Sequence, residues 1–501
     1  MKIFKEYLQD QHFLLPPSLE EFVVENHEVR IINDIVDTME LSPLLVKYEG
    51  GGAPAYHPTM MLKVIVYAYS QSIYSSRKIA QELKTNTAFM FLSGLQTPDF
   101  RTICLFRAQN ADVLPELFVE AVRLCASLGM IGLGHIAFDG TKLKANASVK
   151  QTRDKDGLEK EIERIKEEMR QMIQASAQID EIEDLKYPNG DGSEIKEELR
   201  KKEYRLKKLQ EAREVLEKEK LEKVNVTEPD SRLMKDRQKL IRPSYNGQIA
   251  VDDKDQIIVA AAIIQDATDN AQFKPMVEQV EKNVGSLPEE SSADSGYFSF
   301  DNLEYAATKH LDVYIPDSNL KALDKKEAED KRYDKSNFHY DEGKNTYVCP
   351  EGKELRQWAQ QKREGKALLN LYRGVSCQAC AVIERCTQAK ARLISHDGRE
   401  PLLEAMRQKL RSEEGKEIYK KRAYTVEPVF GEMKWDGRKL SMYLRGFLKV
   451  QGEFSLMCLV HNIKKVIKKV LEGKVSLHGK HEELVAATGN LAERLALACA
   501  A

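Results

Sequence analysis

The fold is decided by residues 245–264, whose sequence is YNGQIAVDDKDQIIVAAAII. The predicted strand Tyr245–Val251 and the nearly continuous apolar run Gln256–Ile264, rich in Ile, Val and Ala, flank the polar turn Asp252-Asp253-Lys254-Asp255. Such runs, bounded by turn residues, are typical of buried β-strands. Upstream, the short apolar run His135-Ile136-Ala137-Phe138 predicts a strand that precedes this pair. The sequence therefore predicts a sheet built around these three strands.

Helices and strands alternate after the central pair. Residues 270–284 have the spacing of an amphipathic helix, and residues 291–294 begin a further strand that ends in a carboxylate. Residues 302–310 are predicted to be helical, and 311–316 to be a strand. The order of three strands, helix, strand, helix, strand is that of the ribonuclease H fold. We therefore expect an α/β core with a mixed five-stranded sheet.

The N-terminal region, residues 1–130, is predicted to be all-helical. An apolar-rich helix covers residues 58–72, a second begins after the N-cap candidate Ser75, and a third follows Pro98-Asp99. Short helices of this length resemble a helix-turn-helix that contacts DNA, with an ordinary helical bundle as the alternative. The candidates for DNA contact on these helices are Arg77, Arg101 and Arg107.

Two insertions interrupt the predicted core. Residues 150–235 carry apolar residues at spacings of three and four on both sides of a Pro-Gly turn, which predicts an antiparallel helical hairpin. Residues 317–400 hold a cluster of cysteines. The core is then expected in residues 131–149, 236–316 and 401–470, followed by a C-terminal tail over residues 471–501.

The net charge of −2 hides a regional asymmetry. Residues 151–230 hold 18 Lys and Arg against 23 Asp and Glu, about −5, whereas residues 401–470 hold 16 against 8, about +8. The basic segment is the one expected near a polyanion, and the acidic segment is expected to stay away from it. No apolar run approaches the ~18 residues of a membrane span, and residues 1–6 lack the apolar core of a signal peptide. We therefore expect a cytoplasmic protein without a membrane partner.

Three separated carboxylates stand at notable places in this pattern. Asp139 closes the first strand, and Asp294 follows a later strand between small residues. Glu427 lies in a predicted helix, with Lys434 seven residues further on the same face. Glu432 is close enough to be a rival for the third position.

Carboxylates at two strand ends and on one helix suit metal-dependent phosphodiester cleavage. Two divalent ions roughly 4 Å apart can activate the nucleophile and stabilise the leaving 3′ oxygen. Magnesium prefers hard oxygen ligands of this kind. Gly140, directly after Asp139, is expected to leave room for a phosphate or an ion.

The chain resembles the DDE transposases of bacterial insertion sequences, in particular the branch whose last acidic residue lies in a Tyr, Arg, Glu, Lys signature. The likeness spans roughly residues 55–470 and is broken by the two insertions. The matching stretches are Phe138-Asp139-Gly140-Thr141, Tyr245-Asn246-Gly247-Gln248, Ala293-Asp294-Ser295-Gly296-Tyr297, Val426-Glu427-Pro428-Val429-Phe430-Gly431, Leu444-Arg445-Gly446 and residues 459–465.

The resemblance implies the roles of several residues. It makes Asp139, Asp294 and Glu427 the catalytic triad that binds two Mg²⁺ or Mn²⁺ ions. It also implies that Lys434 and Arg422 or Tyr419 contact DNA phosphates. The spacing departs from the signature at one point, because four residues rather than three separate Arg422 from Glu427. Lys421 is therefore an alternative to Arg422.

The resemblance also implies the activity and the partners. The protein would bind the terminal inverted repeats of its element, hydrolyse DNA to free a 3′ hydroxyl, and join that end to target DNA. Pairing two ends would require at least a homodimer, and the protein would be associated with the nucleoid. Two alternatives stay open, namely a catalytically inactive DNA-binding regulator and a ribonuclease H-like nuclease without strand transfer.

Four of the eight cysteines cluster in the second insertion. In a chain without an export signal, such a cluster suggests a metal before a disulfide. Four thiolates suit a tetrahedral structural zinc site, although only one CxxC pair is present. Reduced cysteines packed in a small subdomain are the alternative. The candidates are Cys349, Cys377, Cys380 and Cys386.

Overall fold

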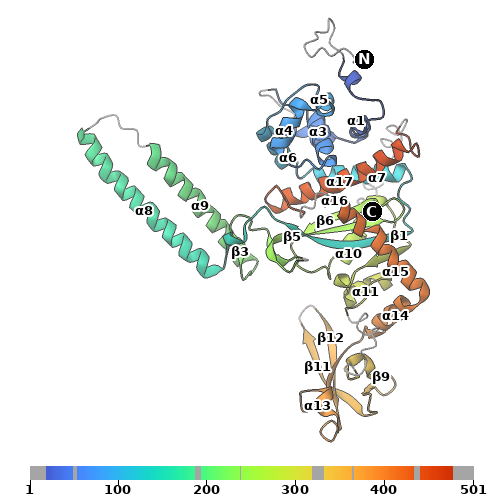
Figure 1. Cartoon of the computed structure of the whole chain (residues 1–501). Coiled ribbons are helices and arrows are strands. Elements are labelled where there is room, and N and C mark those ends of the chain that lie inside the picture. The colour runs from blue at the N-terminus through green and yellow to red at the C-terminus, as the bar shows by residue number, and fades with distance from the viewer. Residues whose placement is uncertain are drawn as a thin grey trace, which may run out of the picture.

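The computed structural model describes residues 18–48, 54–186, 193–236, 238–318, 332–363, 366–433 and 440–477. A sheet flanked by helices lies at the centre of Figure 1, with the N-terminal helices above it. A long helical hairpin projects to one side, and a small β-rich module lies below. The predicted combination of an α/β core with a helical N-terminal region is confirmed.

The N-terminal region is helical throughout its described residues. Its main helices are α1 (Glu28–Thr38), α3 (Pro58–Ser70), α4 (Ser76–Thr85), α5 (Thr87–Ser93), α6 (Phe100–Gln109) and α7 (Leu114–Ser127), with the short elements η1 (Leu19–Phe22), α2 (Ser42–Leu45) and η2 (Val46–Tyr48). The long C-terminal helix α17 (Phe447–Leu471) packs against α1, α3 and α7 and also against the sheet. One continuous hydrophobic core therefore runs from the N-terminal helices into the α/β core.

The central sheet has six strands rather than the five expected. They are β1 (His135–Lys144), β4 (Arg232–Lys235), β5 (Ile241–Asp252), β6 (Ile258–Ile264), β7 (Glu290–Ala293) and β8 (Asp312–Tyr314). The main order is β6-β5-β1-β7-β8, in which β5 is antiparallel to β1 and β6, and β7 is parallel to β1 and β8.

The additional strand comes at the end of the segment expected to form the helical hairpin. Arg232–Lys235 pairs antiparallel with Ile241–Ser244, the early part of β5. The early residues of β5 extend beyond the stretch that β6 covers, so their backbone groups are free to pair with another strand. After β1, the central sheet therefore resumes within residues 150–235.

Two helices follow the strands of the sheet as predicted. α10 (Phe273–Val284) packs against β5, β6 and α7, and α11 (Phe300–Thr308) precedes β8. α10 ends at Gly285, whose φ of +88° gives the left-handed backbone common after helices. The alternation predicted from the sequence therefore holds across residues 241–314.

The first insertion contains two antiparallel helices, α8 (Lys155–Lys186) and α9 (Ser193–Lys218), which extend away from the core in Figure 1. The Pro-Gly turn expected between them lies outside the described residues. At the base, β2 (Thr152–Arg153) pairs with β3 (Val224–Asn225). A separate apolar cluster stabilises this base, formed by Leu158, Ile162, Ile165, Leu209, Ala212, Leu216, Val224 and Val226.

The second insertion forms a small sheet of order β13-β12-β11-β10-β9. The elements are η5 (Lys335–Asn337), β9 (His339–Asp341), β10 (Thr346–Val348), β11 (Glu354–Arg363), β12 (Lys366–Gly374), α13 (Ile383–Cys386) and β13 (Leu393–Asp397). The chain then continues into α14 (Glu400–Arg411), α15 (Glu413–Thr425) and α16 (Glu427–Met433). Among the described residues, no helix is long and apolar enough to cross a membrane.

Candidate active site

The two predicted aspartates lie on neighbouring parallel strands. Phe138 of β1 pairs with Ala293 of β7, so Asp139 and Asp294 lie side by side at the edge where β7 ends. The expectation that Asp139 closes its strand is wrong, because β1 continues to Lys144 and Asp139 pairs with Ile249 of β5. Asp139 is 5% exposed, and its Oδ1 accepts a hydrogen bond from the Gly140 amide at 2.8 Å. Asp294 caps the short helix η4 (Ser295–Tyr297) by accepting from the Gly296 amide at 2.8 Å.

Helix α15 brings a cation to this edge. It packs against β1, β7 and β8, and Arg422 near its end reaches the sheet. Arg422 Nη1 lies 3.5 Å from Asp139 Oδ2, and Nη2 lies 3.4 Å from Glu427 Oε1. Arg422 therefore connects the carboxylate of the first strand with the carboxylate that begins α16.

The charge around Arg422 is dominated by carboxylates. Burial alone would lower the pKa of Arg422, but the negative charges of Asp139, Asp294 and Glu427 outweigh burial, and the pKa is raised. Burial raises the pKa of Tyr419, whose side chain also forms a hydrogen bond with Arg422. The predicted Tyr419 and Arg422 thus face the acidic residues in this structure.

Lys421 and Glu432, the alternatives named from the sequence, form ion pairs with other residues. Lys421 Nζ lies 3.0 Å from Glu290 Oε2, so Arg422 is the residue of this pair that contacts Asp139. Glu432 contacts α17, with Oε2 3.3 Å from His461 Nδ1 and Oε1 2.9 Å from Lys465 Nζ.

The surroundings of Glu432 fix its charge. The hydrogen bond from His461, together with Lys465, lowers the pKa of Glu432 to about 2. Glu432 is therefore held as an anion by α17, whereas Glu427 lies on the side of Asp139. The geometry favours Glu427 over Glu432 as the third acidic residue.

The three carboxylates surround Arg422 without forming a metal-binding group as they stand. The Glu427 side chain is 57% exposed, in contrast to the buried Asp139. Among the residues that the structure describes, no set of three or more His, Cys, Asp or Glu side chains is arranged to hold a metal ion. Their oxygen donors have the chemistry that magnesium prefers, but Glu427 would have to move closer.

A fourth carboxylate, Asp269, lies beside the predicted pair and was missed in the sequence. Its Oδ1 accepts hydrogen bonds from Asn246 Nδ2 at 2.6 Å and Gln248 Nε2 at 2.7 Å. Lys142 Nζ lies 3.7 Å from the same oxygen. The only sequence signal was an acidic residue between the third strand and the next helix, a position that gives no contact by itself.

The space beside Gly140, expected to be open for a phosphate or an ion, is occupied by other side chains. A Cβ atom at Gly140 would lie 2.5 Å from Gln248 Nε2 and 2.8 Å from Asp269 Oδ1. The space beside Asp139 is therefore filled by the side chains of Gln248 and Asp269, not left open for a phosphate or an ion. A Cβ at Gly296 would similarly lie 3.3 Å from Asp269 Oδ2, which places Asp269 next to the Asp294 turn.

The pKa values of two buried groups, Tyr297 and Lys142, reflect the negative charge of this region. Burial raises the pKa of Tyr297 well above its usual value, and Asp269, Asp139 and Asp294 raise it further. The Tyr297 hydroxyl donates to Gln248 Oε1. Burial lowers the pKa of Lys142, while the same three carboxylates act in the opposite direction. Tyr297, Gln248 and Lys142 thus lie around one acidic centre, which is formed by Asp139, Asp269 and Asp294.

The residues predicted to contact DNA differ in how exposed they are. Arg107 is 4% exposed and donates to the Tyr69 hydroxyl at 2.9 Å, the Tyr74 carbonyl at 2.9 Å and Ser76 Oγ at 2.5 Å. The expected DNA contact of Arg107 is therefore wrong, because its guanidinium is used inside the helical region.

Two other predicted arginines are exposed, and one predicted lysine is not described. Arg77 and Arg101 lie on α4 and α6, and their guanidinium carbons are 5.1 and 5.7 Å from the ring centre of Phe100. Lys434 lies outside the described residues. Arg77 and Arg101 stay available as DNA contacts.

Two stretches of the chain match family models of transposases. Residues 348–467 match the family described as Transposase DDE domain, and residues 17–109 match Transposase domain (DUF772). The first match includes Arg422 and Glu427. Comparisons with curated proteins and with solved structures give no match.

The structure shows an α/β core with Asp139, Asp269 and Asp294 close together, and the family matches add the class of protein. They support a DDE transposase of the insertion-sequence type. The resemblance found in the sequence is thereby confirmed.

Proposed function

We propose that the protein cuts and joins DNA at an active site formed by Asp139, Asp294 and Glu427. One observation carries the proposal: Asp139 in β1 lies beside the end of the parallel strand β7, which Asp294 follows, and Arg422 joins Asp139 to Glu427. The strand order β6-β5-β1-β7-β8, with the first three antiparallel and the last two parallel to β1, supports a ribonuclease H-like core. The substrate is the DNA end of the protein's own element.

Transposases of this type generally use divalent metal ions. Asp139, Asp294 and Glu427 are the residues that would hold Mg²⁺ or Mn²⁺, two ions per active site. When bound, the ions supply an activated water and stabilise the leaving 3′ oxygen. Glu427 is the ligand that must approach, and its exposure leaves it free to do so.

The residues of the chain position the DNA for two successive displacements. In the first, water attacks the phosphorus, the bond to the 3′ oxygen breaks, and that oxygen leaves as a hydroxyl. In the second, this 3′ hydroxyl attacks a phosphodiester of target DNA and releases a new 3′ hydroxyl. Arg422 and Tyr419 are proposed to contact the phosphate next to the reacting bond, with Arg422 exchanging a carboxylate for the phosphate.

A basic groove beside α15 supports a path for the DNA backbone. The groove lies between the β5–β6 turn, α15 and the end of α17, and six lysines line it against three acidic residues. Lysines that neutralise phosphates bind DNA without regard to sequence. The lysines are Lys254, Lys421, Lys465, Lys468, Lys469 and Lys474.

Sequence recognition is proposed for the N-terminal helices. Arg77 and Arg101 flank the partly exposed Phe100, which gives this face two cations and one apolar group. The terminal inverted repeats are the proposed ligand of this face, and pairing of two ends calls for two protomers. Such a protein would reside at the nucleoid.

The test is incubation of the full chain with labelled DNA carrying its own flanking ends, supercoiled target DNA and Mg²⁺. We expect nicks at the element ends and joined products, both abolished in Asp139→Asn, Asp294→Asn and Glu427→Gln, while DNA binding persists. Glu432→Gln is the matched control and should still cleave. Binding without cleavage would instead identify a regulator, and cleavage without joining would identify a nuclease.

A further inference from the structure

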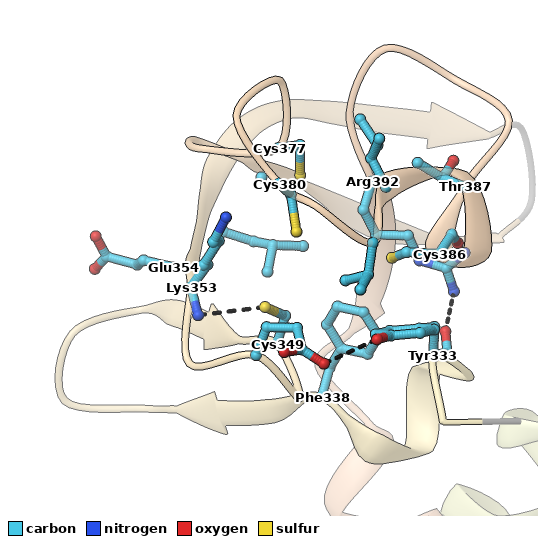
Figure 2. A pocket seen from close by; sticks show the side chains of 15 residues that line it. Tyr333, Phe338, Cys349, Lys353, Glu354, Cys377, Cys380, Cys386, Thr387 and Arg392 are labelled. Atoms are coloured by element: carbon cyan, nitrogen blue, oxygen red, sulfur yellow. Dashed lines mark hydrogen bonds between the residues drawn. The ribbon is translucent and has the colours of Figure 1, made fainter. Parts of the chain in front are cut away.

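Four cysteines from three segments meet at one pocket of the β9–β13 module. Cys349 follows β10, Cys377 and Cys380 lie in the turn after β12, and Cys386 ends α13. Figure 2 shows the four side chains around this pocket. All four are free thiols and are partly buried, so they are neither disulfides nor fully exposed. Segments well separated in sequence thus place soft ligands around one volume.

The turn at Cys349 directs a backbone amide at the cysteine sulfur. The Lys353 amide donates to Cys349 Sγ at 3.3 Å, and the Gly352 amide donates to the Cys349 carbonyl at 2.8 Å. Gly352 has a φ of +71°, which a glycine adopts without strain. The tight turn therefore fixes the position of the Cys349 sulfur at the pocket.

The turn at Cys377 and Cys380 fixes the second pair of ligands. The Cys380 amide donates to the Cys377 carbonyl at 3.0 Å, so the CxxC segment is a tight turn. A Cβ on Gly374 would lie 2.2 Å from Cys377 Sγ. Only glycine at this position lets the Cys377 sulfur lie against the end of β12. The backbone thus makes specific room for this sulfur.

The size of the module gives a bound ion a structural purpose. Its fully buried apolar residues are few, namely Phe338, Tyr347, Leu355, Tyr372 and Ile394. Cys349 and Cys386 pack against this cluster. A module with so small a core commonly requires a metal or a disulfide for stability.

We propose that Cys349, Cys377, Cys380 and Cys386 bind one structural zinc ion in tetrahedral Cys₄ coordination. Among the described residues the thiols are not arranged as a metal-binding group, so binding requires the four sulfurs to move closer together. The ion crosslinks β10, β12 and α13. It is separate from the ions proposed for the carboxylates, which prefer oxygen ligands.

The test is metal analysis of the full chain purified without added metal. We expect about one zinc per chain, its loss in the Cys377→Ser/Cys380→Ser double variant, and its retention in Cys104→Ser, which changes an exposed cysteine of the N-terminal helices. Asp139→Asn should also retain zinc, which separates this site from the catalytic one. Active protein without zinc, or a double variant that keeps its zinc, would overturn the proposal.

A second measurement avoids dependence on the folding of the double variant. Folded wild-type protein is titrated with a mercurial thiol reagent in the presence of a chromogenic zinc chelator. Release of zinc in step with modification of four thiols is the expected result. Replacement by Co²⁺ should produce the sulfur-to-metal charge-transfer absorption of thiolate coordination, and a spectrum without that absorption would contradict cysteine ligation.

Discussion

Asp269 occupies a position in which it can tune the acidic site without being one of its three predicted ligands. Its Oδ1 is held by the amides of Asn246 and Gln248, and Gln248 in turn accepts from Tyr297. This chain of contacts fixes one negative charge next to Asp139 and Asp294. We infer that Asp269 positions Gln248 and raises the affinity of the site for cations.

Asp269→Asn tests this inference. The substitution removes the negative charge and places an amide where Asn246 and Gln248 donate to a carboxylate oxygen. Cleavage should therefore fall about 10- to 100-fold at limiting Mg²⁺. A structural defect would lower the rate at every Mg²⁺ concentration, whereas the expected effect is partly restored by more Mg²⁺. The measurement is a Mg²⁺ titration of cleavage, with Asp266→Asn as the neighbouring control. An unchanged Mg²⁺ dependence would remove Asp269 from the site.

Glu432 provides a prediction of pH dependence. Its pKa falls from 4.5 to about 2 because His461 and Lys465 bind the anion. A depressed pKa means that the stabilisation is present above pH 4.5 and is lost as the pH falls toward 2. Glu432→Gln should therefore be less stable than wild type at pH 6, and the difference should shrink below pH 4.5. Urea unfolding at several pH values measures it, and a pH-independent difference would contradict the assignment.

The residue scale also shows where sequence inference succeeds and fails. Asp139, Asp294 and Glu427 could be proposed from the sequence because each stands in a short stretch that resembles a known motif, and their catalytic roles stay predictions. The burial of Arg107 was not, because it depends on Tyr69 and Tyr74, more than 30 positions away in the chain. The position of Asp269 could not be predicted for the same reason, because its partners Asn246 and Gln248 lie on β5, more than 20 positions earlier in the chain.

At the scale of elements, hydrophobic pattern predicted the strands and helices of the core. Strand β4 was missed because four residues with two charged ends give no period-two pattern of their own. β4 pairs with residues 241–244 of β5, the part of that strand that β6 does not cover. The orientation of α15 toward β1 and β7 was likewise invisible, since it results from packing between distant segments.

The approach of α17 to the turn between α6 and α7 depends on one glycine. A Cβ at Gly452 of α17 would lie 2.1 Å from the carbonyl oxygen of Ala111 in that turn and 2.7 Å from its carbonyl carbon, and backbone atoms cannot rotate away. Gly452→Ala should destabilise the protein by about 1–3 kcal/mol through a forced shift of the helix. Urea unfolding measures the loss.

Gly431→Ala in α16 is the matched control. A Cβ at Gly431 meets nothing within 4 Å, so the substitution should be neutral or slightly stabilising, as expected for alanine in a helix. Equal stability of Gly452→Ala and wild type would show that α17 and the turn between α6 and α7 adjust freely and that the close approach is not a constraint.

At the scale of the whole molecule, the N-terminal helices and the α/β core are not separate bodies. α17 contacts both, and one hydrophobic core includes residues from α1 to α17. The domain boundaries expected from the sequence stay predictions, because composition marks insertions better than it marks a shared core. A DNA end bound by the N-terminal helices would thus be coupled to the acidic site through packed helices.

The α8–α9 hairpin is the part of the molecule that should be dispensable for chemistry. Its segment carries a charge of about −5 over residues 151–230, which disfavours lying along DNA. Its base must stay, however. Glu228 accepts from the Tyr245 hydroxyl at 2.5 Å and from the Gly446 amide at 2.7 Å, and Asp230 accepts from the Phe447 amide at 2.9 Å.

The excisable piece is therefore the distal part, residues 167–203. Replacing it with a short turn keeps the apolar base cluster and the Glu161–Arg205 pair, whose Oε1 and Nη2 are 2.6 Å apart. We expect this variant to fold and to nick a pre-assembled DNA end. We expect pairing of two protomers to be weakened, because the apolar stripes of a projecting helical hairpin commonly pack against a second copy. Sedimentation measures the pairing and a nicking assay measures the chemistry. A folded variant that cannot nick would place the hairpin in the active site, since neither the retained base nor the sheet would then account for the loss.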